Sequence, residues 1–87
     1  MSIQEEFAAA ADRVKTLSAK PDNQTLLDLY ALYKQGSEGD VTGKKPGRLN
    51  MVARAKFEAW EGRKGMGKDD AMKAYVELVD RLVAADG

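Results

Sequence analysis

Apolar residues recur at helical spacing in four separate segments of the chain, and no segment shows the strict alternation of a half-buried strand. In the first segment, Ser2 and Glu5 have the spacing of a capping box, which predicts that a helix begins here. Lys20-Pro21 closes this segment, because the residue before a proline is disfavoured in the α region. We expect a helix over about residues 4–17, with its inner face formed by Phe7, Ala10, Ala11, Val14 and Leu17.

The second periodic segment follows Asp22 and Asn23, either of which can cap a helix. We expect this helix to run to about Gln35, and Gly36 is available for the left-handed residue that often follows a helix. Its apolar residues form one amphipathic stripe, made of Leu26, Leu29, Tyr30 and Tyr33.

The C-terminal end of this stripe has an unusual composition. Tyr30, Tyr33 and Lys34 stand at positions i, i+3 and i+4, so their side chains share one face of the helix. Two phenols and an ammonium group could together hold a flat ring and a phosphate. They could equally form an ordinary edge of the core, with the lysine stem on apolar surface and its charge in water. The stripe alone leaves both interpretations open.

The segment from residue 36 to residue 49 is rich in glycine and polar residues and has no periodicity. A loop this long in a small domain is usually functional or mobile, although it can also be a spacer between two helices that run side by side. Its glycines do not form a phosphate-binding fingerprint, because no strand precedes them and no Gly-Lys-Ser or Gly-Lys-Thr follows.

Two more helices are predicted after this loop. Asn50 can cap the third helix, whose inner side is expected to hold Met51, Ala55, Ala59 and Trp60. The fourth helix is expected to begin near Lys68, and its apolar stripe consists of Met72, Tyr75, Val76, Val79, Leu82 and Val83. Four helices around one core are the economical arrangement, so we expect an all-α four-helix bundle that forms a single domain over residues 1–87.

Charge and composition argue against several classes of function. Positive and negative side chains balance at 14 each, so no overall field attracts nucleic acid. The chain has no cysteine and no histidine. That removes the thiolate nucleophile, the commonest general base and the commonest metal ligands. We therefore expect no catalytic residues and no metal site.

The sequence also bears on location and assembly. The N-terminus has neither the basic nor the apolar region of a secretory signal, and no apolar run approaches the length of a membrane span. We expect a cytoplasmic protein with at most transient membrane contact. A monomer is expected as well, because four packed helices leave no further apolar stripe to cover.

A series of short motifs runs through nearly the whole chain in one order and spacing. It consists of Phe7, Lys20-Pro21, Leu29-Tyr30-Ala-Leu-Tyr33-Lys34-Gln35, Gly39-Asp40, Pro46-Gly47, Ala55-Lys56-Phe57-Glu58-Ala59-Trp60, Lys64-Gly65 and Asp70-Ala71-Met72-Lys73-Ala74-Tyr75. Each piece alone is weak, but the full series strongly resembles the acyl-CoA-binding protein family. The resemblance implies an up-down-down-up bundle that binds, buffers and transports medium- to long-chain fatty acyl-CoA esters without chemistry and without a cofactor.

The resemblance also assigns roles to individual positions. The residues implied to hold the 3′-phosphate of the ribose are Tyr30, Lys34 and Lys56. Those implied to surround the adenine and ribose are Lys15, Tyr33 and Tyr75. Those implied to line or border the groove for the acyl chain are Leu26, Leu27, Ala55 and Ala11.

Some positions depart from the pattern of the family. Phe57 stands where tryptophan is usual, which keeps a ring but loses the indole N–H. Val52 occupies a position that is often lysine, and Gly67 removes a hydroxyl cap from the fourth helix. These departures bear on the affinity and the preferred acyl length more than on the class of ligand.

Two other classes of function remain as alternatives. A small helical interaction module could keep the fold and use its groove for a peptide or a partner protein. An enzyme such as a thioesterase or an acyltransferase is the weaker alternative, because the chain has no histidine, no cysteine and no Gly-x-Ser-x-Gly motif.

Overall fold

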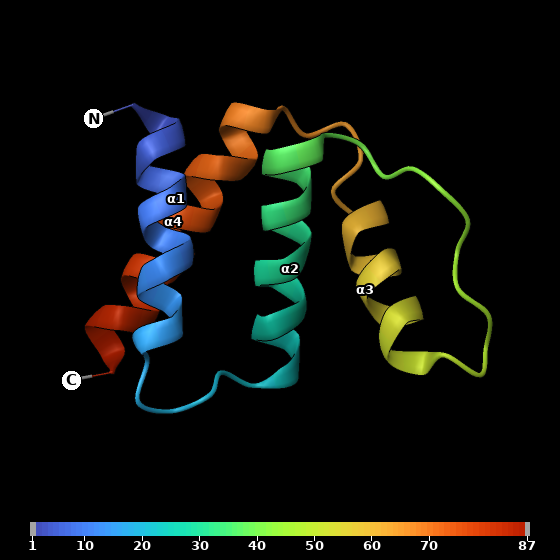
Figure 1. Cartoon of the computed structure of the whole chain (residues 1–87), viewed down its shortest axis with the longest axis horizontal. Coiled ribbons are helices and arrows are strands. Elements are labelled where there is room, and N and C mark those ends of the chain that lie inside the picture. The colour runs from blue at the N-terminus through green and yellow to red at the C-terminus, as the bar shows by residue number, and fades with distance from the viewer. Residues whose placement is uncertain (1, 87) are drawn as a thin grey trace.

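The computed structural model describes residues 2–86, and its elements over that range are helical, with no strand. They are α1 (Ile3–Arg13), a short 3-10 helix η1 (Val14–Thr16), α2 (Asn23–Glu38), α3 (Met51–Glu61) and α4 (Lys68–Ala85). In Figure 1, α1 and α4 run in one direction while α2 and α3 run in the other. The predicted all-α, up-down-down-up four-helix bundle is therefore confirmed.

Two helices, α1 and α2, begin where short polar side chains accept free backbone N–H groups. The capping box at α1 is present, because Glu5 donates its backbone N–H to Ser2 Oγ at 3.1 Å and Ser2 donates its own to Glu5 Oε1 at 3.2 Å. Asp22 caps α2 by accepting the backbone N–H of Thr25 at 2.8 Å. Asn50 occupies the N-cap position of α3, but its side chain makes no capping hydrogen bond, so only its expected place is confirmed.

The end of α2 differs from the prediction. The helix continues past Gln35 to Glu38, and the residue with positive φ is Gly39, at +84°. Gly36 instead lies buried inside α2, where α1 and α4 approach it closely. A Cβ atom at Gly36 would lie 3.1 Å from Met72 Cγ and 3.2 Å from Phe7 Cζ. Glycine is therefore used here for close packing and not for a left-handed turn.

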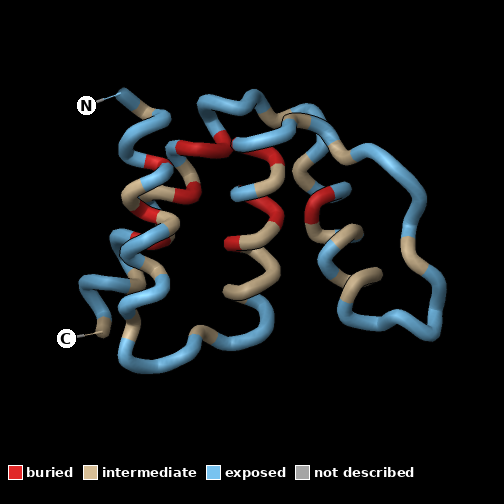
Figure 2. Tube along the Cα trace, viewed as in Figure 1, coloured by how far each residue is buried: buried red, intermediate tan, exposed pale blue. Residues whose placement is uncertain are grey.

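The core lies between α1, α2 and α4. Its buried cluster consists of Phe7, Ala10, Leu29, Leu32, Met72, Tyr75 and Val79. In Figure 2 the buried positions lie mainly on these three helices. The third helix packs on α2 and buries Trp60 there, so α3 forms the outer edge of the bundle. This arrangement leaves surface between α2 and α3 for a ligand.

Three residues of the predicted apolar stripes and inner faces are exposed. Tyr33 is 43% exposed, although its ring contacts Phe7 of α1 and Tyr75 of α4. Met51 is 76% exposed at the first residue of α3, and Val83 is 38% exposed in the last turn of α4. Both lie at helix ends, beyond the packed centre of the bundle.

A cluster of hydrogen bonds around the buried Gln35 joins the loops at one end of the bundle. Gln35 is fully buried and donates from Nε2 to Asp40 Oδ1 at 2.9 Å and to the carbonyl of Met66 at 2.7 Å. The same Asp40 oxygen accepts the backbone N–H of Gly65 at 2.8 Å. These hydrogen bonds, with that from Gly65 the largest cause, lower the pKa of Asp40. The cluster connects the loop after α2 to the segment before α4.

Two structural features are absent from the described part of the chain. None of its helices is long and apolar enough to cross a bilayer. Within residues 2–86, no group of side chains has the composition and spacing to hold a metal ion.

Candidate ligand-binding site

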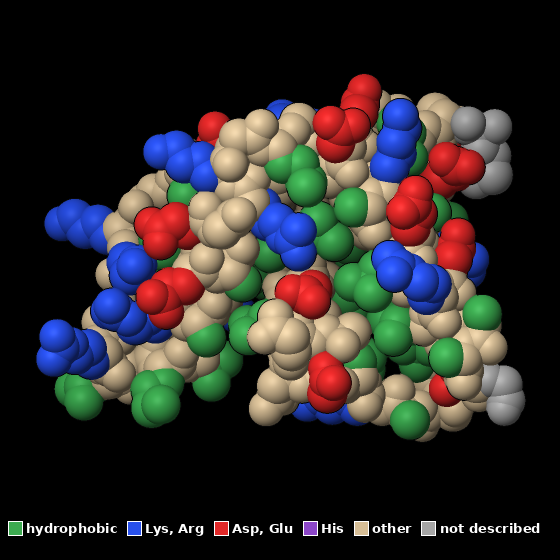
Figure 3. All heavy atoms as spheres, turned by 180° about the vertical axis from the view of Figure 1, so that it is seen from behind, with side chains coloured by type: hydrophobic (Ala, Val, Ile, Leu, Met, Phe, Trp, Pro, Cys, Tyr) green, Lys and Arg blue, Asp and Glu red, His purple; other side chains and the backbone are tan. Residues whose placement is uncertain are grey.

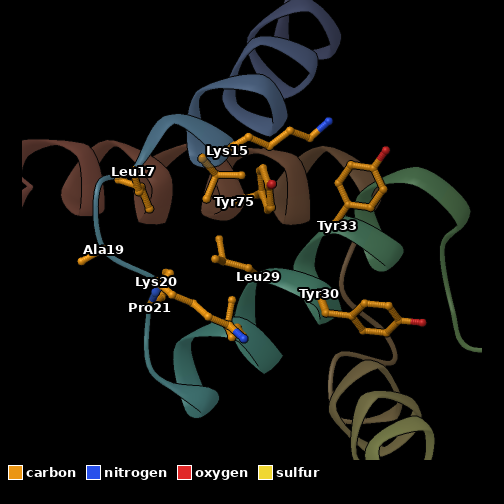
Figure 4. A pocket seen from close by; sticks show the side chains of 11 residues that line it. Lys15, Leu17, Ala19, Lys20, Pro21, Leu29, Tyr30, Tyr33 and Tyr75 are labelled. Atoms are coloured by element: carbon orange, nitrogen blue, oxygen red, sulfur yellow. The ribbon is translucent and has the colours of Figure 1, made fainter.

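A cavity of about 470 Å³ lies where η1, α2 and α4 meet the segment that connects η1 to α2. Figure 4 shows the side chains around it. Lys15 contributes from η1, Tyr33 from α2, Tyr75 from α4 and Lys20-Pro21 from the connecting segment. We call this space the aromatic cavity. Its wall combines tyrosine rings, ammonium groups and aliphatic side chains.

Three aromatic rings pack together beside this cavity. Phe7 stacks on Tyr33 with ring centroids 5.2 Å apart and an interplanar angle of 27°. Tyr75 meets both rings edge to face, at 5.1 Å from Phe7 and 5.8 Å from Tyr33. Such edge-to-face contacts hold rings in fixed orientations. The cluster therefore offers a rigid aromatic surface for a flat ligand.

The two tyrosines of this cluster are exposed to different degrees. Tyr75 is only 4% exposed, whereas Tyr33 is 43% exposed, so Tyr33 is the ring open to solvent. Burial raises the pKa of Tyr75. A tyrosine hydroxyl is protonated at neutral pH even without this shift, so that of Tyr75 can donate a hydrogen bond. In Figure 4 the Tyr33 hydroxyl and the Lys15 ammonium project on the same side of the aromatic cavity.

A second cavity of about 670 Å³ lies between α2 and α3. The side chains lining it are Lys20, Asn23, Leu26, Leu27, Tyr30, Val52, Ala55 and Lys56. We call it the α2–α3 groove. Lys20, Leu26 and Tyr30 line both this groove and the aromatic cavity, so the two spaces adjoin. Together they form one extended surface, aromatic at one end and largely aliphatic at the other.

Two lysines lie on aromatic faces near this surface. Lys56 Nζ lies 5.4 Å from the centroid of the Tyr30 ring, and this contact joins α3 to α2. Figure 4 shows the Tyr30 ring directed away from the aromatic cavity, on the side of α3. Lys34 Nζ lies 4.9 Å from the centroid of the Trp60 ring. Both contacts have cation–π geometry, which orients the ammonium groups without neutralising them.

Lys34 has a second partner. Its ammonium pairs with Glu38 one turn further along α2, and the hydrogen bond to Glu38 raises the pKa of Lys34. Half of the Glu38 side chain is exposed, and such a pair contributes at most about 1 kcal/mol. A ligand phosphate could therefore replace Glu38 at small cost.

The structure brings most of the expected site residues onto one surface. Those lining the aromatic cavity, the α2–α3 groove or both are Lys15, Leu26, Leu27, Tyr30, Tyr33, Ala55, Lys56 and Tyr75. Lys34 lies beside Trp60 and is not among the lining residues of either space. Ala11 is half-buried and packs against the core cluster, also away from these lining residues.

One cation of the site was missed by sequence analysis. Lys20 lines both the aromatic cavity and the α2–α3 groove. In the sequence, Lys20 belongs to a helix-ending Lys-Pro pair, and the series of family motifs includes this pair without implying a role for the lysine. Helical periodicity could not have found it, because it belongs to a connecting segment whose path depends on tertiary packing.

The connecting segment is anchored to the C-terminal end of α4. Ser18 donates its backbone N–H to the Asp86 carboxylate at 3.1 and 3.2 Å, and its hydroxyl donates to Asp86 Oδ1 at 2.7 Å. These bonds, with that from the Ser18 hydroxyl the largest cause, lower the pKa of Asp86. The anchor holds the residues next to Ser18, which line the aromatic cavity.

Fold and site together define a small all-α binding protein with adjoining aromatic and aliphatic cavities. The family profile described as "Acyl CoA binding protein" matches residues 4–79. The chain is 53% identical over 81 residues to "Acyl-CoA-binding protein homolog 1" of Caenorhabditis elegans, covering 93% of this chain and 94% of that protein. It is 48% identical over 82 residues to the acyl-CoA-binding protein of Saccharomyces cerevisiae, covering 94% of each.

A solved structure agrees with these matches. The crystal structure of Oryza sativa acyl-CoA-binding protein 2 superposes with a TM-score of 0.92 at 39% identity, covering 97% of this chain and 93% of that chain. The chain belongs to the acyl-CoA-binding protein family, which confirms the resemblance in its motifs. Membership of this family supports the binding of acyl-CoA.

Proposed function

We propose that this protein binds medium- to long-chain fatty acyl-CoA esters and serves as their buffer and carrier in the cytoplasm, as a monomer and without chemistry. The observation that carries the proposal is the junction of the aromatic cavity and the α2–α3 groove at Tyr30 and Leu26. A CoA ester has a flat purine, several phosphates and an apolar tail. The adjoining cavities supply rings, cations and aliphatic side chains in a matching order.

The aromatic cavity is proposed to take the nucleotide end of the ligand. Tyr33 and Tyr75 present their rings there, and Lys15 stands at the same rim. Stacking of a base on an aromatic side chain contributes about 1–3 kcal/mol. The exposed ring of Tyr33 is the more accessible partner, while the buried Tyr75 packs edge to face against it.

Tyr30, Lys34 and Lys56 are proposed to hold the 3′-phosphate. A hydrogen bond to a charged group contributes about 1.5–3 kcal/mol, which solvent exposure reduces. Lys56 already lies over the Tyr30 ring, so its ammonium and the phenol are close to one another before the ligand arrives. Lys34 must turn away from Glu38 to join them.

The α2–α3 groove is proposed to take the acyl chain. Leu26 and Leu27 line it from α2 and Ala55 lines it from α3. Each methylene buried there contributes at most about 0.8 kcal/mol, so affinity should rise with acyl length until the groove is full. Ala11 is proposed to act indirectly, by packing α1 against the core that supports this side of the site.

The absence of catalysis is part of the proposal. The side chains around both cavities are aromatic, aliphatic, amide and ammonium groups. They include no histidine and no cysteine, since the chain has none. The site therefore offers contacts for an ester without a paired base and nucleophile to attack it.

The test is calorimetric titration of the folded protein with palmitoyl-CoA, with shorter acyl-CoA esters, and with free CoA and palmitate as controls. The proposal expects tight binding of the ester, weaker binding of shorter esters, and far weaker binding of both controls. Absence of binding to the ester by folded protein would contradict it. Release of free thiol from palmitoyl-CoA by the purified protein would overturn the non-catalytic part alone.

A further inference from the structure

Three of the exposed large apolar residues lie together at one end of the molecule. Leu49 is 102% exposed, Met51 76% and Val52 69%, and all three fall within four consecutive positions. They occupy the end of the long loop and the first turn of α3. We call these three residues the apolar tip. Single exposed apolar residues are common, but a contiguous group on a monomer surface marks an interaction site.

Basic residues flank the apolar tip in the sequence. Residues 41–57 contain no aspartate or glutamate, and their cations are Lys44, Lys45, Arg48, Arg54 and Lys56. The chain as a whole is neutral, and five of its 14 cations fall in this segment without an acidic residue among them. Figure 3 shows Lys and Arg side chains gathered beside hydrophobic ones along the edge of the molecule that carries α3 and its loop.

Two of these cations remain available for a partner. Lys45 pairs with Glu58 at 3.5 Å and Glu61 at 3.4 Å, and Arg54 lies 3.9 Å from Glu58. Lys44 and Arg48 are exposed, and they form no ion pair within residues 2–86. The charge next to Leu49 is therefore not neutralised by the fold.

The tip is continuous with the candidate site. Val52 belongs to the tip and also lines the α2–α3 groove with Ala55 and Lys56. Figure 1 shows the loop and the beginning of α3 projecting on the side away from α1 and α4. A flat surface can therefore meet the tip while the core helices stay clear of it.

We infer that the apolar tip docks on bilayers that contain anionic lipids, with Leu49 and Met51 entering the interface and Lys44 and Arg48 lying on the negative head groups. Apolar side chains flanked by cations are the composition that binds such surfaces. A second copy of the chain fits less well, because pairing two tips would bring like charges together. This inference goes beyond the proposed function, since docking needs no bound acyl-CoA. It gives the α2–α3 groove a fixed position beside the membrane.

The test is co-sedimentation of the full chain with vesicles of phosphatidylcholine, with and without phosphatidylserine. Binding is expected to require phosphatidylserine and to weaken as salt is raised. The double variant Leu49→Ser with Met51→Ser, called the tip variant, should weaken vesicle binding at least about tenfold, because the apolar contact is lost. Val83→Ser is the matched control, since Val83 is an exposed apolar residue on α4, and it should bind as the parent does.

A second pair of variants tests the charges. Lys44→Gln with Arg48→Gln should weaken binding by about fivefold for each cation removed. Lys73→Gln with Arg81→Gln removes two exposed cations from α4 and should leave binding unchanged. All four variants change exposed side chains, and circular dichroism verifies that each one folds.

Three results would overturn the inference. The first is that the tip variant and Val83→Ser lose vesicle binding to the same extent. The second is that the parent protein binds vesicles equally well with and without phosphatidylserine. The third is concentration-dependent self-association that the tip variant abolishes while vesicle binding persists. Titration with palmitoyl-CoA in the absence of vesicles should be unaffected in the tip variant. Failure of docking is thereby distinguished from failure of acyl-CoA binding.

Discussion

The ammonium of Lys56 on α3 lies 5.4 Å from the centroid of the Tyr30 ring on α2. Both side chains also line the α2–α3 groove, and Tyr30 lines the aromatic cavity as well. The pair therefore stands at the junction of the two spaces and links the outer helix to the bundle. Its geometry places a cation and a phenol near each other without using up the charge of the lysine.

This pair leads to a prediction that separates the Tyr30 ring from its hydroxyl. Tyr30→Phe keeps the cation–π contact but removes the group proposed to bind phosphate, so palmitoyl-CoA binding should weaken about tenfold with little loss of stability. Lys56→Ala should weaken binding by a similar or larger factor. Calorimetry measures the affinity and urea unfolding measures the stability. Lys73→Ala, on the exposed side of α4, is the control, and parental affinity in both site variants would rule out this assignment.

The ion pair between Lys34 and Glu38 predicts opposite changes of palmitoyl-CoA affinity when either partner is replaced. Lys34→Ala should weaken binding of palmitoyl-CoA about tenfold, because a charged donor to the phosphate is lost. Glu38→Gln should strengthen palmitoyl-CoA binding by about twofold to fivefold, because Lys34 then has no ion pair to break before it contacts the phosphate. The same titrations with 3′-dephospho-palmitoyl-CoA should show neither effect. Persistence of both effects with that ligand would place Lys34 on another part of CoA.

The close contact at Gly36 leads to a prediction about stability. Alanine there would place a Cβ 3.1 Å from Met72 Cγ and 3.2 Å from Phe7 Cζ, and overpacking of this kind costs about 1–3 kcal/mol. The better helix propensity of alanine offsets about 1 kcal/mol of this. Gly36→Ala should therefore lower the free energy of urea unfolding by up to about 2 kcal/mol.

Gly47→Ala is the matched control, because a Cβ at that position meets no atom within 4 Å. It should be neutral or slightly stabilising, since alanine restricts the unfolded chain. If Gly36→Ala were as stable as Gly47→Ala, the close approach of α1, α2 and α4 would not limit the side chain at residue 36.

Gly36 also shows how far the sequence alone could lead. A glycine that ends a helix and a glycine that allows close packing look the same in one sequence, so the end of α2 was placed three residues too early. The beginnings of α1 and α2 were predictable, because Ser2, Glu5 and Asp22 act on neighbouring backbone groups. Local signals of this kind depend little on the rest of the fold.

In the candidate site too, some features were predictable from the sequence and others depend on tertiary packing. Helical spacing places Tyr30, Tyr33 and Lys34 on one face, but it could not show that Leu32 is buried in the core while Tyr33 stays exposed. Helical periodicity does not place Lys20 at the site, because its position depends on the path of a connecting segment. Family resemblance supplied what periodicity lacked, namely the expected roles of residues far apart in the chain.

The anchor between Ser18 and Asp86 leads to a prediction about pH. Hydrogen bonds from Ser18 lower the pKa of Asp86 in the folded protein below its ordinary value of 3.8. The carboxylate therefore stabilises the fold fully above the unfolded pKa, and this contribution is lost as pH falls through the lower folded pKa. Unfolding free energy should decrease as pH falls below about 4, where Asp22 and Asp40, whose pKa values are also lowered, act in the same direction.

Asp86→Asn isolates the part of this effect that belongs to the anchor. The variant should be less stable than the parent at pH 7 and should lose less stability on acidification, because the amide does not titrate. It should also weaken palmitoyl-CoA binding at pH 7, since the segment next to Ser18 lines the aromatic cavity. Asp12→Asn, an exposed change on α1, is the control for both measurements. If Asp86→Asn and Asp12→Asn gave the same acid unfolding curve and the same affinity, the C-terminal anchor would not support the cavity.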